Sequence, residues 1–543
     1  MPAASAAKVS AAAPAETSAE LERLCAVDQP PPADFETAAS LTGFGKYNYL
    51  ILLSAICCSL SHQFSTTAMS YLLPAAHCDL NLKPSDKGLL NAIGYGGMIT
   101  SAFAWGFMSD ILGRRKLLII AYTLDGILSF IGSFTQSLLF LVLMKFLGGI
   151  IICGPISIQK TFISEFHCAK YRTRVLMASG LFVALSTIVI PGIAWGIIPL
   201  PWSWSFFGGY VTYNSWRVFV AVGSIPSFLS ALIISGCAET PKFLMTKGRL
   251  DEALKVFRMI YKYNTGNDPK TFPVHQLKKE TPYETESLTR STSANGSPGS
   301  ALGGGLKEAK RLFIKPLLPR ALMIFVIQYS TLFGMNTMRL WAPQLFASIE
   351  EYNEYHKTDN GSLASASICD MITFTPPEDE LHGVEEGSCG VAMINSTVYV
   401  NNMTIAAISG LFYIFAGFLV NLVGKKAIML TGYAVAASCS LAIYWSYTSG
   451  AALAFISIYV SLVGVCHITS LAFVVDIFPT SLRNMAMSLN IMFGQLGTFS
   501  GNMAFPYLLS ASCVAPFAVL GGIILVSAAV VLLLPNTDKA ALQ

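Results

Sequence analysis

Long apolar runs separated by short polar segments make up most of the chain. A helix that spans the hydrocarbon core of a bilayer needs roughly 20 mostly apolar residues. The segments that pass this test are 47–72, 88–108, 117–135, 138–163, 175–198, 216–236, 319–343, 400–423, 427–447, 452–475, 486–509 and 514–534. We therefore predict an all-α integral membrane protein with twelve transmembrane helices, whose surroundings are the lipid bilayer.

Basic residues in the short connections indicate the orientation. The connections after spans two, four, eight and ten carry Arg114, Arg115, Lys116, Lys170, Arg172, Arg174, Lys425, Lys426 and Arg483. The connections after spans three, five, nine and eleven carry essentially no charge. Because Lys and Arg are retained on the cytoplasmic side, we expect both termini to be cytoplasmic.

Polar segments flank two bundles of six spans, 47–236 and 319–534. Residues 1–46 are rich in Ala and Pro, and we expect a disordered cytoplasmic tail there, with a short second tail at 535–543. The cytoplasmic segment 237–318 begins with KGRLDEALKVFRMIYK, whose helical spacing of apolar residues predicts an amphipathic helix. It continues into TPYETESLTRSTSANGSPGSALGGG, which is typical of a flexible linker.

The second long connection, 344–398, lies on the opposite face and is acidic. This orientation makes it extracellular or lumenal, the side on which glycosylation occurs. Asn360 and Asn395 stand in sequons there, and we expect both to be glycosylated. Asn402 also stands in a sequon, but we place it too close to the membrane to be modified.

Cys78, Cys369 and Cys389 stand in polar connections that the orientation places on the extracellular or lumenal face. Cys369 and Cys389 share the acidic loop and its oxidising compartment, in which a disulfide can persist. We predict a Cys369–Cys389 disulfide, with Cys78 as the competing partner.

An internal repeat relates the two bundles. GFMSDILGRR at 106–115 matches GFLVNLVGKK at 417–426, an offset of 311 residues. The same offset aligns Gly106 with Gly417, Gly113 with Gly424, Glu165 with Asp476 and Arg172 with Arg483. Two motifs in one register and on one membrane face predict a duplicated six-helix unit. Parallel repeats of this kind place the substrate site between pseudo-symmetric halves, near the bilayer midplane.

Several of these segments resemble known transporter motifs. GFMSDILGRRK between spans two and three resembles the signature loop of the major facilitator superfamily. SEFHCAKYRTR, SWRVF and ETPKFL resemble motifs of sugar and organic-ion porters. Within that branch, ETAASLTGFGKYNYLILL, LLPAAHCDLNL and the long loop before span eight resemble the synaptic vesicle glycoprotein 2 and related-protein family. The resemblance implies the major facilitator fold and a multi-pass protein of the plasma membrane or of synaptic or secretory vesicles.

Departures from the family patterns restrict the function. Hexose porters carry a glutamine pair in span seven, where this chain has Ser330 and Thr331, so sugar transport is disfavoured. The vesicle-protein relatives usually have an acid in span one, and SHQFSTT here has none. Lys145 stands at the start of span four where the family commonly has Arg, and Asn421 replaces the motif Asp in the second half.

Charges at the cytoplasmic ends of the spans are candidates for a gate. The candidates are Gly106, Asp110, Gly113, Arg114, Arg115, Glu165, Arg172, Glu239, Asp476 and Arg483. We expect Arg114 and Arg115 to reach Glu165, and Arg483 to serve Asp476, in pairs that hold the two halves closed on the inside. Exposed pairs contribute about 1 kcal/mol each, weak enough to open in every cycle. The alternative is that these charges only fix the topology.

Two opposite charges lie inside spans three and four. An ionisable residue at the centre of a span costs about 2.5–3.5 kcal/mol on insertion scales, so each is a functional hypothesis. Asp125 and Lys145 fall at depths within roughly one helical turn of each other. We expect one buried ion pair, which is either structural or coupled to a proton or a substrate.

Polar residues of spans one, seven and ten are candidates for the substrate cavity. His62 and His467 lie near mid-membrane, where histidine titration could couple to transport. The alternative is a neutral histidine bonded to a neighbouring helix. Asn336 is a further cavity candidate, and we expect Arg339, one turn nearer the outside, to extend to the interface.

The function follows from this topology and from what the motifs exclude. The 35 basic and 31 acidic residues are too balanced to indicate nucleic acid. The sequence has no phosphate-binding glycine loop, metal-spaced Cys/His cluster or nucleophile elbow, so we expect neither an enzyme nor a cofactor or metal site.

Two functions fit the sequence. We favour a secondary transporter that moves a small organic solute by alternating access, with a proton or other ion as an optional coupling partner. The alternative is a non-transporting vesicle or cell-surface glycoprotein that acts as a receptor or trafficking partner. The intact first motif and the buried Asp125, His62 and His467 favour transport, whereas the missing acid in span one and Asn421 favour the alternative.

Overall fold

The computed structural model describes residues 32–77, 79–206, 208, 210–278, 314, 317–356, 366–374, 396–478 and 480–534. Its first half contains α3 (Lys46–Ala76), α4 (Pro84–Leu112), α5 (Arg114–Gly132), α6 (Leu138–Ile152) continued by α7 (Pro155–Glu165), α8 (Ala169–Ile197), and α9 (Ser215–Val222) continued by α10 (Ser224–Ser235). Its second half contains α15 (Leu317–Tyr355), α18 (Ser396–Val423), α19 (Lys425–Ala442) with η4 (Ile443–Trp445), α20 (Ser449–Ile477), α21 (Thr480–Ala511) and α22 (Val514–Leu533). Each predicted span coincides with one of these segments, so the prediction of a twelve-span, all-α chain is confirmed.

Nine of the described segments are long and apolar enough to cross a membrane by length and composition alone. The spans outside this set are α4, α5 and α21. Helices α4 and α21 pack against each other, and their glycine, serine and asparagine residues lower their hydropathy. Helix α5 begins with three basic residues and buries Asp125. Polar residues of these spans therefore serve helix packing and internal sites, for which hydropathy is a poor measure.

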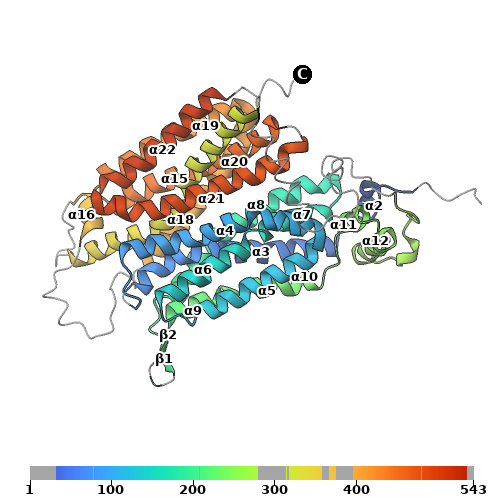
Figure 1. Ribbon diagram of the computed structural model, residues 1–543, viewed down its shortest axis with the longest axis horizontal. Helices are drawn as coiled ribbons and strands as arrows, with labels where there is room; N and C mark the ends of the chain where they lie inside the picture. The colour runs from blue at the N-terminus through green and yellow to red at the C-terminus, as the bar shows by residue number, and fades with distance from the viewer. Residues whose placement is uncertain are drawn as a thin grey trace, which may run out of the picture.

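Three helix pairs join the halves: α4 with α21, α8 with α18, and α3 with α15. Span two thus meets span eleven, span five meets span eight, and span one meets span seven. This pairing is what a pseudo-twofold axis along the membrane normal produces. Figure 1 shows the first half, blue to green, lying lengthwise beside the second half, yellow to red.

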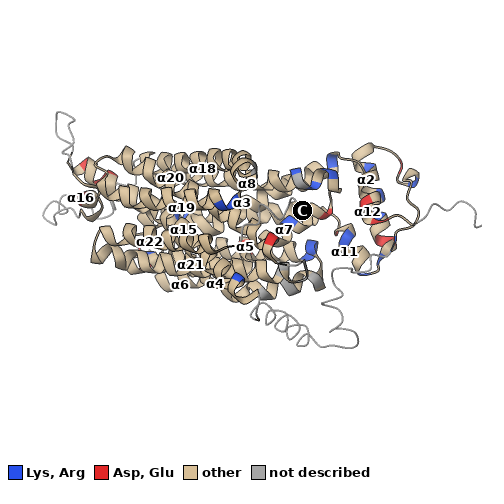
Figure 2. Ribbon diagram, turned by 90° about the horizontal axis from the view of Figure 1, so that it is seen from above, with Lys and Arg blue, Asp and Glu red and all other residues tan. Residues whose placement is uncertain are grey.

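Charged residues gather at one end of the helices. Figure 2 shows Lys and Arg around α2 (Phe35–Leu41), α7, α11 (Pro241–Thr246) and α12 (Leu250–Thr265), and very few along the middle of the bundle. We call this end the basic end, and the opposite end, where α16 (Ile368–Thr373) lies, the loop end. A band almost free of charge is what the lipid hydrocarbon requires. The basic end is therefore the face that the sequence predicts to be cytoplasmic.

The repeat extends to the backbone torsions. Gly113, between α4 and α5, has φ 89° and ψ 157°, and Gly424, between α18 and α19, has φ 87° and ψ 156°. This region of torsion space is essentially restricted to glycine. The motif glycines therefore make the same sharp turn in both halves.

A small subdomain covers the first half at the basic end. Helix α12 buries Ala253, Leu254, Phe257 and Ile260, which confirms the predicted amphipathic helix. Helix α2 packs Phe35 against Phe257, and the N–H of Ala33 donates to the carbonyl of Gln276. The 3-10 turn η2 (Pro269–Thr271) follows α12 and brings the chain back to α2. The predicted linker falls at 281–305, outside the described residues.

The prediction of a disordered tail up to residue 46 is wrong for residues 32–46. Phe35, Ala38 and Ala39 are buried on one face of α2. This apolar face is short, and its partner α12 lies more than 200 residues further along the chain. The Ala-rich composition of the whole segment obscured it.

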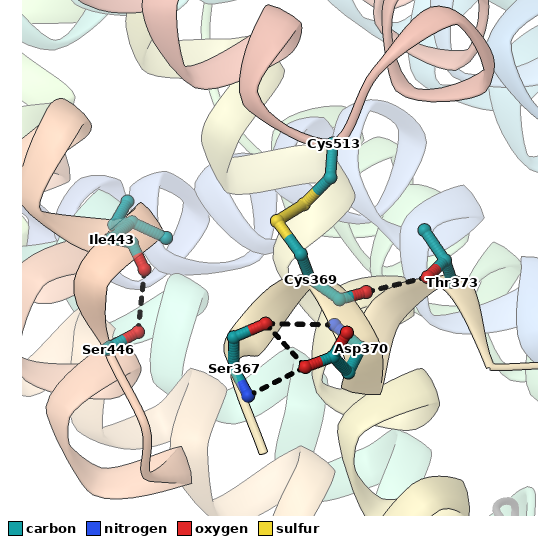
Figure 3. Close-up of a disulfide and its surroundings, with 7 residues drawn as sticks. All are labelled: Ser367, Cys369, Asp370, Thr373, Ile443, Ser446 and Cys513. Carbon is teal, nitrogen blue, oxygen red and sulfur yellow. Dashed lines mark hydrogen bonds between the residues drawn. A yellow bond between two sulfur atoms is a disulfide. The ribbon is translucent and has the colours of Figure 1, made fainter.

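At the loop end, α15 continues to Tyr355, so residues 344–355 of the predicted acidic loop are helical. Helix α16 follows, with the Ser367 hydroxyl accepting from the N–H of Asp370 and the Asp370 carboxylate accepting from the N–H of Ser367 (Figure 3). The hydrogen bonds that the carboxylate accepts from the Ser367 hydroxyl and the Ser367 N–H hold the pKa of the Asp370 carboxyl below its usual range. The N–H of Ile368 donates to the Ser446 carbonyl, which anchors α16 beside η4.

The predicted Cys369–Cys389 disulfide is wrong, because Cys369 pairs with Cys513. Their Cα atoms are 5.7 Å apart, and Figure 3 shows the bridge between α16 and the start of α22. Cys513 borders an apolar run in the sequence, but α21 ends at Ala511 and α22 begins at Val514, so the thiol lies in the turn between them. Cys78 and Cys389 lie outside the described residues.

This disulfide gives a first prediction. Each of Cys369→Ser and Cys513→Ser is expected to lower the thermal unfolding midpoint by the same amount, and the double variant by no more. For a bridge across 144 residues the chain-entropy argument gives up to about 4–5 kcal/mol, and less when the unfolded chain stays helical in the membrane. Cys57→Ser, at a free thiol, is the control. A non-reduced peptide linking Cys369 to Cys389 in mass spectrometry would contradict the assignment.

A hairpin of β1 (Ser203–Phe206) and β2 (Val211–Asn214) lies at the loop end, where the sequence predicts only a connection. Next to it, Arg217 of the SWRVF segment is buried and pairs with Asp79 at 2.6 Å. The Arg217 guanidinium also lies over the Trp216 ring and donates to the Thr135 carbonyl. The motif therefore fixes the loop end of the first half.

Candidate functional site

The two halves bring four basic side chains to the seam between them. His62 (α3) and Lys160 (α7) belong to the first half, and Arg339 (α15) and His467 (α20) to the second. The charge of Lys160 acts on both histidines, and that of Arg339 acts on His62. Both histidines lie near the middle of long helices, of 31 and 29 residues. We call these four residues the seam cluster.

Arg339 lies within electrostatic range of tyrosines from both halves. Its charge acts on Tyr71 (α3), Tyr95 (α4) and Tyr413 (α18). The prediction that Arg339 extends to the interface is therefore wrong. The apolar run ends soon after Arg339, but α15 continues to Tyr355, so this residue lies deeper in its helix than the run suggests.

The cations of the seam cluster have no acidic partner in the described part of the chain. Neither Lys160 nor Arg339 forms one of its ion pairs. The Nε of Arg339 and the Nδ1 of His62 are buried without a hydrogen-bond partner. A charge inside the membrane costs about 2.5–3.5 kcal/mol on insertion scales, so Arg339 is a candidate for a binding role, whereas Lys160 lies nearer the basic end and its side chain is exposed.

The remaining cavity candidates are tied to neighbouring helices. Nε2 of Gln328 lies 3.2 Å from Nδ1 of His467, and the Ser470 hydroxyl donates to Oε1 of Gln328. This bond holds the His467 ring in place, as the alternative drawn from the sequence expects. Asn336 donates to the Thr498 hydroxyl at 2.8 Å and is buried between α15 and α21, so the structure assigns it a packing contact.

Asp125 lies in a cavity inside the first half. Its carboxylate accepts hydrogen bonds from Ser61, Ser65 and Ser227, at 2.7 to 3.2 Å. Lys145 lines the same cavity, and its charge acts on Asp125. The two form no direct ion pair within 4.0 Å, so the predicted pair is wrong in its geometry. Serines of α3 and α10 reach the carboxylate first, and Lys145 approaches from α6.

This cavity contains further unsatisfied polar groups. Both amide atoms of Asn91 are buried without a hydrogen-bond partner, and Asn91 lines the cavity with Asp125 and Lys145. Unsatisfied buried groups of this kind are normally compensated by water or an ion. The cavity therefore has the composition of a site for a proton, water or a small ion.

The halves make close contacts at the loop end. Nζ of Lys87 donates to Oε1 of Gln344 at 3.3 Å, which links α4 to α15. A Cβ added to Gly88 would lie 2.8 Å from the carbonyl oxygen of Asn502 in α21. Tyr399 of α18 belongs to the same buried cluster as Ile190 of α8. Contacts of α4 with α15, of α4 with α21 and of α8 with α18 therefore hold the two halves together at the loop end.

At the basic end, the described ion pairs stay within one half. Nε of Arg114 lies 3.5 Å from Oε2 of Glu165, and Nζ of Lys425 lies 2.6 Å from Oδ2 of Asp476. These pairs are related by the repeat, since each joins the first basic residue of the turn to the acid that follows the fourth span of its half. The predicted contact of Arg114 with Glu165 is confirmed, but both members of each pair belong to the same half, so these two pairs do not clamp one half to the other.

The second basic residue of each turn caps a helix. Arg115 donates to the Ser235 carbonyl in the last turn of α10, rather than reaching Glu165. Lys426 donates to the Leu532 and Leu534 carbonyls at the end of α22. A cation at a helix C-terminus is favourable because it satisfies free carbonyls and complements the helix dipole.

Arg172 also differs from its predicted role. It pairs with Glu36 of α2 and donates to the Ser164 and His167 carbonyls. Helix α2 is thereby attached to the connection between α7 and α8. Burial also lowers the pKa of His167 in this connection.

Glu239 supports the first glycine turn. Its Oε1 accepts from the N–H groups of Arg114 and Arg115, each at 3.1 Å, at the start of α5. A Cβ added to Gly113 would lie 2.5 Å from Oε2 of Glu239. Two features therefore require glycine at position 113. Its backbone torsions exclude other residues, and a side chain would collide with the Glu239 carboxylate that caps α5.

Gly113→Ala is accordingly expected to destabilise the first half. Positive-φ strain of this kind costs on the order of 1–3 kcal/mol, so the thermal midpoint and the folded yield should both fall. Gly43→Ala, at another positive φ but with nothing near its Cβ, is the matched control and should show the strain without the clash. Equal losses in the two variants would contradict the capping role of Glu239.

Several predicted site residues fall where the structure gives no side-chain description. Gly106 and Asp110 lie in α4 and Arg483 lies in α21, and their side chains are outside the described set. Asn360 and Asn395 lie outside the described residues. Asn402 is buried in α18 and donates to the Val398 carbonyl, which agrees with its exclusion as a glycosylation site.

Sequence reasoning missed Lys160 and misplaced Arg339. Lys160 lies near the basic end of span four, where a lysine is expected in any membrane protein because basic residues are retained on the cytoplasmic side. The available signal was its position five residues before Glu165, on the face of α7 that turns toward the seam. Helix rotation about its own axis decides this, and a single sequence leaves that rotation open.

The six-plus-six architecture defines a class of protein, the major facilitators. Among solved structures, the chain is similar to the xylose transporter XylE from E. coli in a partially occluded inward open conformation. The TM-score is 0.62 at 16% identity, over 91% of this chain and 99% of that chain. An inward open structure of XylE matches with a TM-score of 0.60 at 16% identity, over 90% and 96% of the two chains. At this identity the likeness concerns the fold.

The family models agree with the fold. Residues 48–356 match the model described as Sugar (and other) transporter, and residues 390–542 match the Major Facilitator Superfamily model. The first match covers more than half of the chain. The chain therefore belongs to the sugar (and other) transporter family of the major facilitators.

Curated relatives narrow the resemblance. Synaptic vesicle glycoprotein 2C of Rattus norvegicus is 27% identical over 333 residues, which is 59% of this chain and 45% of that protein. Synaptic vesicle glycoprotein 2A of Rattus norvegicus is 27% identical over 328 residues, or 58% and 44% of the two chains. The matched region spans less than half the length of these relatives. The predicted resemblance to the synaptic vesicle glycoprotein 2 branch is confirmed.

Proposed function

We propose that the protein is a secondary transporter that moves a small organic solute across a membrane by alternating access between its two halves. The observation that carries this proposal is the distribution of contacts along the seam. The halves touch at the loop end through α4, α15 and α21, whereas the described ion pairs at the basic end remain within each half. This is the arrangement of a transporter closed on one side and able to open on the other.

The seam cluster supports transport over the alternative function. A receptor or trafficking partner with a transporter-like shape has no need of an arginine such as Arg339, whose Nε is buried without a hydrogen-bond partner within α15. Four basic side chains contributed by both halves fit a substrate that binds between them. The similarity to vesicle glycoproteins supports the alternative function, a receptor or trafficking partner. The uptake experiment described below distinguishes the two functions.

We further propose that transport is coupled to a proton carried by Asp125. Three serines and a nearby lysine give this carboxylate two stable states, ionised or protonated, inside a protein cavity. Ser61 and Ser65 belong to α3, the helix that also carries His62. A change in the charge of Asp125 can therefore be transmitted to the seam through one helix.

Uptake into proteoliposomes tests the proposed function. The purified full chain would be reconstituted and offered a panel of radiolabelled organic solutes at two external pH values. At least one solute is expected to accumulate, and faster with protons at the uptake side. If no solute moves although the protein is folded and correctly inserted, the receptor function replaces transport. We expect the protein to reside in the plasma membrane or in a secretory vesicle membrane, with both termini in the cytoplasm.

A further inference from the structure

The hairpin of β1 and β2 has one apolar and one polar face. Its register pairs apolar residues with apolar residues and polar residues with polar residues: Trp204 with Tyr213, Phe206 with Val211, Ser203 with Asn214, and Ser205 with Thr212. Because successive side chains of a strand point to opposite sides, the apolar pairs share one face and the polar pairs share the other. A two-stranded hairpin is marginally stable by itself in water, so the apolar face needs a surface to pack against.

The described part of the chain leaves this apolar face largely uncovered. Trp204 and Phe206 keep 46% and 49% of their surface exposed, and Tyr210, just before β2, keeps 87%. Trp202 extends the row of rings, since its centroid lies 6.0 Å from that of Trp204. A contiguous exposed patch of this kind marks a contact with a membrane or with another protein.

Ring contacts join the apolar face to the exposed side of α5. The Tyr213 ring centroid lies 5.1 Å from that of Phe134, which lies 5.4 Å from that of Phe130. Further exposed apolar residues of α5 follow at helical spacing: Ile120, Leu124, Ile127 and Ile131. An exposed apolar stripe along a transmembrane helix contacts the acyl chains of the lipid. The apolar face of the hairpin therefore continues a surface that already lies in lipid.

The position and the charge of the hairpin also fit the bilayer surface. Figure 1 shows the hairpin projecting sideways from the end of the first half, across the direction of α5 rather than along it. A segment that projects sideways at this level runs along the membrane instead of away from it. The sequence has no charged residue between Arg174 and Arg217, so the contact is apolar and needs no charged partner.

We propose that the hairpin anchors the protein in the leaflet at the loop end, with Trp204 and Phe206 against the acyl chains and the polar face toward water. An open sheet edge is excluded from the hydrocarbon core, where its backbone groups would stay unpaired. The headgroup region supplies water to that edge and is the level at which Trp and Tyr concentrate. This inference goes beyond the proposed function, because it concerns how the protein is held in the membrane.

The base of the hairpin is fixed to the first half. The Tyr213 hydroxyl donates to Oγ of Ser133, at the end of α5, over 3.1 Å. The buried pair of Arg217 with Asp79 follows directly after β2. The anchor therefore holds the loop end of the first half at the membrane surface.

Spin labels on alternate residues of β1 test the proposal in the full chain, reconstituted in phosphatidylcholine liposomes. The single variants are Ser203→Cys, Trp204→Cys, Ser205→Cys and Phe206→Cys. Each label would be probed with oxygen, which dissolves in lipid, and with a water-soluble nickel chelate. We expect the ratio of oxygen to nickel collisions to alternate, severalfold higher at 204 and 206 than at 203 and 205.

Two further labels calibrate this ratio. Asp251→Cys, exposed on α12, gives the value in water, and Ile127→Cys, on the exposed side of α5, gives the value in lipid. Signal from the protein's own free thiols is subtracted with the chain that has no added cysteine. Collisions with nickel at the water value in all four positions of β1 would overturn the proposal. Protection of all four from both probes would show a second copy over the hairpin and would overturn it as well.

Tryptophan fluorescence gives a second readout that needs no label. The double variant Trp202→Phe with Trp204→Phe should lower the intensity that is quenched by phospholipids brominated near the headgroup. Trp341→Phe removes a buried indole and should leave that quenched intensity unchanged. Equal quenched intensity in the double variant and the unmodified chain would refute the contact with lipid.

Discussion

Asp125→Asn is expected to abolish accumulation driven by a pH gradient while leaving exchange of solute across the membrane. One proton per solute and a gradient of two pH units support about 100-fold accumulation, since each factor of ten corresponds to about 1.4 kcal/mol. An asparagine keeps the size of the carboxylate and its contacts with Ser61, Ser65 and Ser227, but it carries no proton in exchange. Accumulation should therefore fall to about the external concentration.

The readout is the ratio of internal to external solute in proteoliposomes with an imposed pH gradient. Asp251→Asn, at an exposed position on α12, is the control and should accumulate solute like the unmodified chain. Gradient-driven accumulation that survives in Asp125→Asn would assign coupling to another group. Loss of both accumulation and exchange would instead indicate a structural role for Asp125.

Gly88→Trp is expected to stop the transport cycle by keeping the loop end open. Even a Cβ at this position would lie 2.8 Å from both the Asn502 carbonyl oxygen and the Pro506 ring in the other half. Overpacking costs about 1–3 kcal/mol, and applied to the closed loop end alone it shifts the population by about 5- to 150-fold. Uptake should fall accordingly, although the protein inserts and folds.

Gly196→Trp is the matched control, because α8 leaves open space around that glycine. It should keep most of the uptake. Normal uptake by Gly88→Trp would show that the contact between α4 and α21 opens without consequence. Size-exclusion chromatography would distinguish misfolding from a transport defect, because a variant that fails to insert would give little folded protein.

The sequence predicts the architecture because each of its signals is local or repeated. Apolar length gives the spans, and basic loops distinguish the two ends. The offset from Gly113 to Gly424 correctly predicts two turns with the same torsions. The repeat also relates two ion pairs, Arg114–Glu165 in the first half and Lys425–Asp476 in the second. In the second half, the sequence analysis expects Arg483 rather than Lys425 as the partner of Asp476.

Contacts that depend on distant elements could not be read in this way. Cys369 pairs with Cys513 because α16 and the turn before α22 lie side by side at the loop end, although 144 residues separate the two cysteines. Glu36 reaches Arg172 because α2 folds back onto the first half. Which residues of α3, α7, α15 and α20 lie at the seam depends on how each helix is rotated about its own axis. The spacing of polar residues along these helices does not predict that rotation.

Distances between spin labels at the two ends of the bundle test alternating access most directly. One pair joins Lys116 to Leu422 at the basic end, and the other joins Leu139 to Tyr507 at the loop end; all four positions are exposed. When Gly88→Trp is introduced, the loop-end distance should lengthen and the basic-end distance should shorten. Distances that stay fixed, or that change in the same direction at both ends, would contradict two halves that rock about a central seam.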